Sequence, residues 1–240
     1  MKTVLRALLV GAAGRMGEAI TAAAGEFQII PCELGDDISA AMRDCDVAID
    51  FSHADVTESL CAAATECQKP LVIGTTGHSQ KQLEVIRSAA SKISIVFASN
   101  FSVGVNALFA LTQRAAGLLG EDFDIEVTEA HHRMKKDAPS GTAKTLLQIL
   151  KESRKDVELI HGREGNVGAR AQNEIGVHSI RGGDTVGDHT VIFAGSGERL
   201  ELTHKASSRE TFARGALRAA HWVIERDPGL YDMRDVLGLK

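Results

Sequence analysis

Two histidines and a group of lysines stand close together in the middle of the chain. His131, His132 and Lys135 follow a strand-like segment, within a run that also holds Arg133 and Lys136. An imidazole titrates near neutral pH, and a lysine beside other cations gives up its proton more readily than an isolated one. The run therefore predicts a site where a small anion is bound and receives a proton.

A helix start follows this run directly. Pro139 precedes Ser140, Gly141 and Thr142, and an apolar helical pattern continues over 143–153. The N–H groups of a helix N-terminus, together with two hydroxyls, can hold a carboxylate. The alternatives are a solvated basic loop with an ordinary helix cap, or a zinc site. We expect no metal, because no third ligand follows the two histidines at a suitable spacing.

A second motif lies near the start of the chain. An apolar run ending at Val10 leads into Gly11-Ala12-Ala13-Gly14-Arg15-Met16-Gly17. Gly11 suits a tight turn, Gly14 allows a pyrophosphate to approach the backbone, and Gly17 allows close packing of helix and strand. The spacing departs from G-x-G-x-x-G, and a simple tight turn is the alternative. Its place between a strand and a helix favours a dinucleotide site.

An acidic residue ends the second predicted strand. Glu33 would accept hydrogen bonds from the adenosine ribose, unless it is an ordinary solvated carboxylate. Leu34 follows it, and then come Asp36 and Asp37, so a 2′-phosphate would meet negative charge. This pattern favours NADH, and NADPH stays open because Arg15 or His53 could neutralise a phosphate.

The elements that position these motifs alternate over the first hundred residues. Strands are predicted at 4–10, 28–32, 47–50, 71–73 and 95–98, with helices at 16–24, 38–42, 55–66 and 79–90. Such β-α-β repeats indicate a doubly wound, Rossmann-like parallel sheet whose strand ends share one edge. We expect this dinucleotide-binding domain to span 1–102, completed by a C-terminal helix within 208–240.

The pattern changes after a long helix predicted at 103–119. Strands are expected at 125–129, 157–160, 177–181, 190–194 and 200–204, around one clear helix at 143–153. Clustered strands with few helices indicate an α+β domain with a mostly antiparallel or mixed sheet. We expect this second domain, 103–207, to bind the substrate; its role in forming the oligomer is what the family resemblance given below implies.

Composition excludes several functional classes. The 240 residues include 44% hydrophobic and 25% charged side chains, with a net charge of −5 and 4% aromatics. These values are typical of a globular protein and argue against a general binder of nucleic acids or membranes. The four cysteines form no C-x-x-C pair, so reduced thiols are expected, and Arg15 and Glu18 follow the short apolar start too closely for a secretory signal. We expect a cytoplasmic protein.

Over essentially its whole length the chain resembles the 4-hydroxy-tetrahydrodipicolinate reductase (dihydrodipicolinate reductase) family of diaminopimelate and lysine biosynthesis. The shared motifs are 11–17, Gly74-Thr75-Thr76-Gly77, 100–106, His131-His132-Arg133-Met134-Lys135 with Asp137-Ala138-Pro139-Ser140-Gly141-Thr142, 195–209 and 229–237. The resemblance implies NAD(P)H-dependent reduction of 4-hydroxy-tetrahydrodipicolinate to tetrahydrodipicolinate with loss of water. It also implies a homotetramer and closure of a hinge on binding.

The resemblance also assigns roles. His131 would donate or accept a proton, and Lys135 would donate one. His132, Ser140, Gly141 and Thr142 would bind the substrate. The cofactor would be lined by Gly11, Ala12, Ala13, Gly14, Arg15, Met16, Glu33, Gly74, Thr75, Thr76, Ala98, Ser99, Asn100 and Phe101.

Two features depart from the family: the segment from Glu33 to Val47 is short, and Leu34 stands where some members carry a basic residue. Both leave the choice between NADH and NADPH open. The alternatives to the whole interpretation are a two-domain reductase of another small acid and a non-catalytic dinucleotide sensor.

Overall fold

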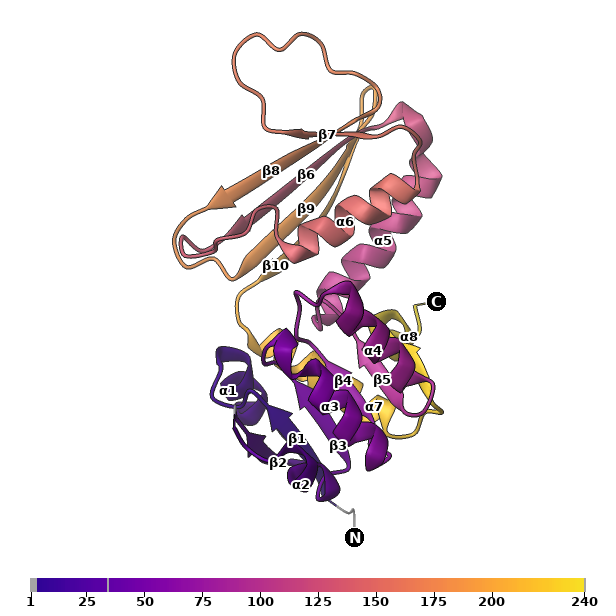
Figure 1. The fold of residues 1–240 in the computed structure, drawn as a ribbon. Coiled ribbons are helices and arrows are strands. Elements are labelled where there is room, and N and C mark those ends of the chain that lie inside the picture. Colours follow the sequence, from indigo (N-terminus) through magenta and orange to yellow (C-terminus); the bar gives the residue numbers. More distant parts are fainter. Residues whose placement is uncertain (1–3, 34, 240) are drawn as a thin grey trace. The chain divides into compact units, whose positions relative to one another are not determined.

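The computed structural model describes residues 4–33 and 35–239, which form two compact units. Unit 1 contains the described residues up to Val103 together with those from Arg209 onward, and unit 2 is Gly104–Ser208 (Figure 1). The two ends of the chain are thus built into one unit.

Unit 1 is a six-stranded parallel sheet with the order β11-β5-β4-β3-β1-β2. Its first part contains β1 (Leu5–Val10), α1 (Arg15–Ala22), β2 (Phe27–Cys32), α2 (Ile38–Arg43), β3 (Val47–Asp50), a 3-10 turn (Ala54–Val56), α3 (Thr57–Glu66), β4 (Leu71–Ile73), α4 (Gln80–Ala90) and β5 (Ser94–Phe97). The chain returns to it as α7 (Glu210–Val223), β11 (Gly229–Tyr231) and α8 (Met233–Leu237).

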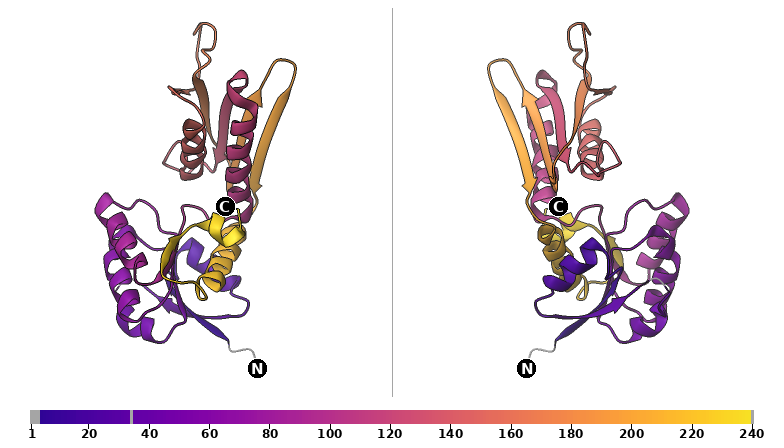
Figure 2. Two further views of the ribbon diagram at one scale, coloured as in Figure 1. Left: turned by 90° about the vertical axis from the view of Figure 1, so that its right-hand side faces the viewer. Right: turned by 90° about the vertical axis from the view of Figure 1, so that its left-hand side faces the viewer.

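Apolar side chains cover both faces of this sheet, because β-strand residues alternate between faces. Leu9 and Ile49 face the core beneath α1 and α7, whereas Leu8 and Ile73 face the core beneath α3 and α4. Figure 2 shows the two pairs of helices on opposite sides of the sheet. The predicted doubly wound parallel sheet is confirmed.

The sixth strand was not predicted. β11 has only three residues, Gly229–Tyr231, and pairs with β5 at the edge of the sheet. A short segment with one exposed leucine, Leu230, has no period that sequence analysis can detect. Its pairing partner determines its structure.

Unit 2 packs two long helices against one face of a five-stranded sheet. Its elements are α5 (Val103–Leu119), a 3-10 turn (Gly120–Asp122), β6 (Asp124–His131), α6 (Gly141–Glu152), β7 (Glu158–His161), β8 (Glu174–Arg181), β9 (Gly187–Ala194) and β10 (Arg199–Ala206), with strand order β10-β9-β6-β8-β7. The β6 strand lies antiparallel to β9 and parallel to β8. The sheet is therefore mixed. A mixed sheet was one of the two forms predicted for this α+β domain.

Alternation along β6 and β9 decides which residues reach the helices. Val127 and Val191 lie buried beneath α5 and α6, and the same side of the strands carries Glu129, His131 and His189 at one end. The apolar core of unit 2 thus ends in a polar cluster.

The glycine-rich segment between β7 and β8 is tied back to the sheet by arginines. Arg163 binds Glu126 and Glu174 at 3.1 and 3.0 Å, and Arg170 binds Asp124 at 2.7 Å.

Among the described residues, no helix combines the length and the apolar character needed to cross a membrane.

Candidate active site

The predicted cofactor residues of unit 1 gather at one edge of its sheet. Val10, Asp50 and Ile73, the last residues of β1, β3 and β4, lie in register, so the loops that follow them start side by side. Backbone bonds join these loops, from the Phe51 N–H to the Val10 carbonyl and from the Gly74 N–H to the Asp50 carbonyl. This is the edge where open α/β sheets bind ligands.

The glycine loop makes a tight turn between β1 and α1. Gly11 adopts a φ of +82°, and a Cβ there would lie 2.7 Å from the Phe51 carbonyl oxygen. A Cβ on Gly17 would lie 2.3 Å from the carbonyl oxygens of Gly11 and Ala12. Gly14 is the N-cap of α1 and makes no side-chain cap hydrogen bond to the first-turn N–H groups. These residues fit a pyrophosphate.

Glu33 lies beside this loop. Its carboxylate accepts a hydrogen bond from the Ala13 N–H, and its own N–H donates to Asp36 at 2.7 Å. The end of β2 therefore presents two carboxylates next to the glycine loop. Leu34, whose departure from the family bears on the cofactor, lies outside the described residues.

A buried carboxyl group lies between the loops that follow β3 and β4. Asp50 accepts hydrogen bonds from the Ser52 N–H and hydroxyl, and the same Ser52 N–H lies 2.9 Å from the Thr75 hydroxyl oxygen. Burial raises the pKa of Asp50, while the bonds from Ser52 oppose that rise. Thr75 is itself buried, whereas Thr76 is exposed on the loop.

Cys32 ends β2 beneath the proposed adenosine position. Its side chain is buried, and burial together with the charges of Asp36 and Glu33 raises the pKa of the thiol. A thiol with a raised pKa is a poor nucleophile. The structure agrees with the interpretation of Cys32 as core packing.

The strongest polar cluster of unit 2 surrounds Glu129. Its carboxylate lies 2.6 Å from Nδ1 of His131 and accepts two hydrogen bonds from Arg181, at 2.7 and 2.8 Å. Glu129 is 1% exposed and His131 is 8% exposed. Burial pushes the pKa of Glu129 upward, but bonds from Arg181, Ser179 and His131 outweigh it and lower that pKa to about 2. The carboxylate is charged near neutral pH.

A second imidazole packs against the first. The rings of His131 and His189 meet edge to face with centroids 5.1 Å apart, and Nε2 of His189 lies 3.0 Å from the Ser140 hydroxyl. Burial, followed by the charge of neighbouring His131, lowers the pKa of His189 to about 4. Burial also lowers the pKa of His131, against the effect of Glu129. The His189 imidazole is therefore neutral near pH 7, whereas the balance between burial and Glu129 sets the charge of His131.

Ser140 connects this cluster to the helix start. Its hydroxyl caps α6 by accepting the Ala143 N–H, and its own N–H donates to Glu129. Gly141 is exposed and Thr142 half-buried at the first turn. The predicted carboxylate-binding N–H groups and His131 are thus joined through one serine.

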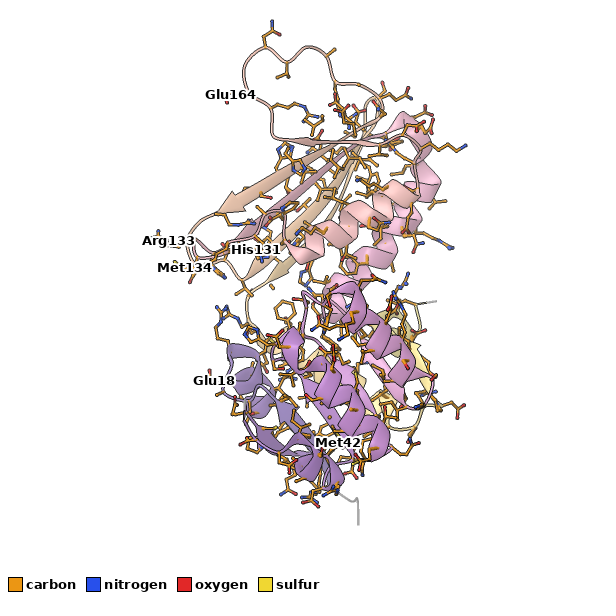
Figure 3. All side chains as sticks on the ribbon, viewed as in Figure 1. Glu18, Met42, His131, Arg133, Met134 and Glu164 are labelled. Carbon is orange, nitrogen blue, oxygen red and sulfur yellow. The ribbon has the colours of Figure 1, made fainter. Side chains whose placement is uncertain are left out.

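Lys135 lies in the loop between β6 and α6. Its ammonium contacts Asp137 at 2.8 Å, its side chain is 21% exposed, and its backbone N–H bonds to the His132 carbonyl. Figure 3 shows His131 at the end of β6, while Arg133 and Met134 project from the loop. Arg133 and Met134 are thus exposed, whereas the predicted functional residues His131 and Lys135 are buried and half-buried.

Glu129, Arg181 and His189 were not predicted as site residues. Glu129 and His131 stand two residues apart in a strand, so their side chains share a face, and this spacing was a usable signal. Arg181 and His189 arrive from β8 and β9, and only the strand pairing brings them to β6. In the described part of the chain, no group of three or more His, Cys, Asp or Glu side chains could hold a metal ion.

Two family models match the chain. The model described as dihydrodipicolinate reductase, N-terminus, matches residues 26–101, and the one described as dihydrodipicolinate reductase, C-terminus, matches residues 104–237. The chain belongs to the dihydrodipicolinate reductase family. This confirms the family resemblance and the class of nicotinamide-dependent oxidoreductase predicted from the sequence.

Named relatives are similar in sequence to this chain over most of both lengths. The 4-hydroxy-tetrahydrodipicolinate reductase of Akkermansia muciniphila is 57% identical over 239 residues, which are 97% of each chain. The enzyme of the same name from Halorhodospira halophila is 49% identical and covers 93% of this chain and 86% of its own.

Solved structures share the fold. A dipicolinate-bound dihydrodipicolinate reductase from Paenisporosarcina superposes with a TM-score of 0.78 at 23% identity, covering 96% of this chain and 98% of that one. A probable dehydrogenase from Thermotoga maritima gives 0.63 at 11% identity, covering 98% of this chain and 93% of that one.

Proposed function

We propose that this chain reduces 4-hydroxy-tetrahydrodipicolinate to tetrahydrodipicolinate, with loss of water, and that the substrate binds at the cluster around His131. The observation that supports this most is the buried Glu129–His131 pair, 2.6 Å apart, next to the N-terminus of α6, which Ser140 caps. The relatives named for this reaction match nearly the whole chain.

The substrate carries two carboxylates, which need cationic and N–H partners. The first-turn N–H groups of α6 at Gly141 and Thr142 would hold one of them, because a helix N-terminus attracts negative charge. His132 and Ser140 would complete the binding set. Ser140 would act through the helix cap, since its hydroxyl is already bonded to Ala143 and His189.

Proton supply is the role proposed for His131 and Lys135. When bound, the nicotinamide cofactor supplies a hydride to the ring, and the negative charge that this leaves is neutralised by a proton. Nε2 of His131 is the ring nitrogen that Glu129 leaves free. The Lys135 ammonium is held by Asp137 and can donate a proton to the leaving hydroxyl; the ring carbon next to that hydroxyl loses a proton as water leaves, so the whole reaction consumes one hydride and one proton.

Unit 1 would hold the cofactor on the glycine loop and the neighbouring strand ends. Gly11 and Gly14 would leave room for the pyrophosphate, and Glu33 would bind the adenosine ribose. We propose a preference for NADH, because Glu33 and Asp36 place negative charge where the 2′-phosphate of NADPH would lie. The exposed Arg15 could contact the 2′-phosphate of NADPH, and NADPH is therefore the second choice of cofactor.

We also propose a cytoplasmic homotetramer. The side of the unit 2 sheet opposite α5 and α6 carries Thr128, Thr190 and Ile192, all half-buried, and none of the described elements of unit 2 covers it. A second copy of the same face would cover it. The free cysteines, of which Cys45 and Cys61 are buried, suit a reducing compartment.

Replacing both proton donors tests the assignment. In a His131→Ala, Lys135→Ala double variant we expect kcat to fall by about 10²–10⁴-fold, the usual contribution of general acids. The measurement is substrate-dependent oxidation of NADH under saturating conditions. Binding of NADH, measured separately by fluorescence, should stay unchanged because the glycine loop belongs to unit 1.

An Arg133→Ala, Lys136→Ala double variant is the matched control. Both side chains are exposed cations in the loop that holds Lys135. We expect its kcat to stay within a few-fold of the unsubstituted protein. Near-normal turnover in the His131, Lys135 variant would show that the role assignment is wrong.

A further inference from the structure

Glu129 is a fully buried carboxylate between a guanidinium and an imidazole. It lies on β6 and is 1% exposed, with Arg181 from β8 on one side and His131 on the other. A buried charge is costly unless it is paired and hydrogen-bonded, and here both carboxylate oxygens are occupied by Arg181. Glu129 and Arg181 thus form a buried ion pair, and the Glu129 carboxylate also contacts one ring nitrogen of His131.

The contact between Arg181 and Glu129 runs diagonally across the strand register. The direct neighbour of His131 on β8 is Arg181, and that of Glu129 is Ser179. Arg181 nevertheless reaches diagonally to Glu129 and also donates to the Asp137 carbonyl oxygen. The guanidinium therefore neutralises the carboxylate and leaves the imidazole without a cation bonded to it.

The Glu129 carboxylate determines which ring nitrogen of His131 holds the proton. A charged carboxylate only accepts hydrogen bonds, so Nδ1, 2.6 Å away, must be the donor. Nε2 is then the nitrogen that gains or loses a proton. It faces Gly187, whose missing side chain leaves space beside it: a Cβ there would lie 3.1 Å from Nε2.

Four charged or titratable groups face His131 from the surrounding elements. Glu129 on β6 favours the imidazolium, whereas Arg181 on β8 and Lys135 in the following loop disfavour it. His189 on β9 packs against the ring. The protonation of His131 is thus a balance between one anion and two cations, with burial added.

We propose that Glu129 and Arg181 are positioning residues for His131: the carboxylate fixes the imidazole with its proton on Nδ1, and the guanidinium limits how strongly that carboxylate favours the imidazolium. This inference rests on the proposed function, in which Nε2 of His131 meets the substrate. Neither residue touches the substrate in this role.

Opposite shifts in one titration test the inference. The midpoint of His131 is measured by NMR on histidine-labelled protein without substrate, and a His131→Asn variant assigns its signal among the nine histidines. Glu129→Gln should lower the midpoint by about one pH unit or more, since it removes the anion and keeps an acceptor. Arg181→Met should raise it by a similar amount, because the carboxylate is then uncompensated.

The pH profile of kcat/KM should move in the same directions. Its limb that reports His131 should shift to lower pH in Glu129→Gln and to higher pH in Arg181→Met. A merely structural role would lower activity in both variants without moving the limb in opposite directions. Arg181→Lys serves if the methionine variant does not fold: a single ammonium neutralises the carboxylate less well, so a smaller upward shift is expected.

Arg163→Met is the matched control. Arg163 pairs with Glu126, which also binds His178, so it forms a similar Arg–Glu–His group elsewhere in unit 2. The His131 midpoint should not move in this variant. Shifts of equal sign in the Glu129 and Arg181 variants, or no shift in either, would overturn the inference. Because the NMR titration needs no substrate, failure of the proposed reaction would leave it readable and is distinguished from failure of this inference.

Discussion

At the residue scale, the proposed chemistry depends on how one imidazole is held. His131 is buried, bonded through Nδ1 to Glu129, and packed edge to face against His189. These contacts leave the ring little freedom to rotate, and Nε2 is the ring nitrogen that meets the substrate in the proposed function. A catalytic group held in this way loses little entropy when the substrate arrives.

Gly187 tests how closely His131 is confined. In Gly187→Ala the new methyl group would lie 3.1 Å from Nε2, and the ring cannot retreat because Glu129 holds its other side. We expect kcat to fall by about 10- to 100-fold, the scale of a small misplacement of a catalytic group. Steady-state turnover with saturating NADH measures the effect.

Gly182→Ala is the control for that substitution. Gly182 follows the neighbouring strand and donates its N–H to the His131 carbonyl, but a Cβ there meets nothing within 4 Å. Its turnover should stay close to the unsubstituted value. Equal losses in both variants would mean that the loop backbone, and not the space beside Nε2, limits activity.

The predicted site residues of this region could be proposed from the sequence because they are close together in the chain. His131, Lys135 and Ser140 stand in one run, where charge and a helix start are visible in the letters. Arg181 and His189 could not be found in this way. Their proximity to His131 exists only after β8 and β9 pair with β6.

At the element scale, α1 must approach the glycine loop closely for its N-terminus to face a phosphate. Gly17 permits this approach, because its Cα lies against the carbonyl groups of Gly11 and Ala12. The helix N-terminus supplies the N–H groups, and the contact at Gly17 keeps them in place.

Gly17→Ala should therefore weaken both folding and cofactor binding. A Cβ 2.3 Å from two carbonyl oxygens forces α1 away, and we expect the free energy of unfolding to fall by about 1–3 kcal/mol. Denaturant unfolding followed by circular dichroism measures this loss, and titration with NADH measures the weaker binding.

Gly117→Ala should change the free energy of unfolding in the opposite direction. Gly117 lies in α5, is exposed, and a Cβ there meets nothing within 4 Å. Alanine is the better helix former, so we expect a gain of about 0.5–1 kcal/mol. An unchanged stability of Gly17→Ala beside such a gain would contradict the close packing of α1.

Helices and strands were largely predictable where their apolar pattern is strong. The long helix Val103–Leu119 and the strand Val47–Asp50 have the predicted bounds. In contrast, β8 begins at Glu174, three residues before the predicted start, because Glu174 and Gly176 give no apolar signal. A Cβ on Gly176 would overlap the Glu126 carboxylate, so side-chain packing from β6 explains that glycine.

At the scale of the whole molecule, the chain builds two units with separate cores. The C-terminal segment completes the first sheet by adding α7 and β11, and the residues between form the second sheet. We propose that unit 1 binds the nicotinamide cofactor and that unit 2 binds the dicarboxylate. The sequence predicted both kinds of sheet, whereas the pairing of β11 with β5 depends on contacts between distant segments.

The most direct measurement is the absorbance of the reduced nicotinamide, with 4-hydroxy-tetrahydrodipicolinate made in the same solution by a synthase that supplies it. We expect the absorbance to fall only when protein, reduced cofactor and substrate are all present, and to fall faster with NADH than with NADPH at equal low concentrations. Tight binding of the cofactor with no substrate-dependent oxidation would contradict the account and favour a dinucleotide sensor.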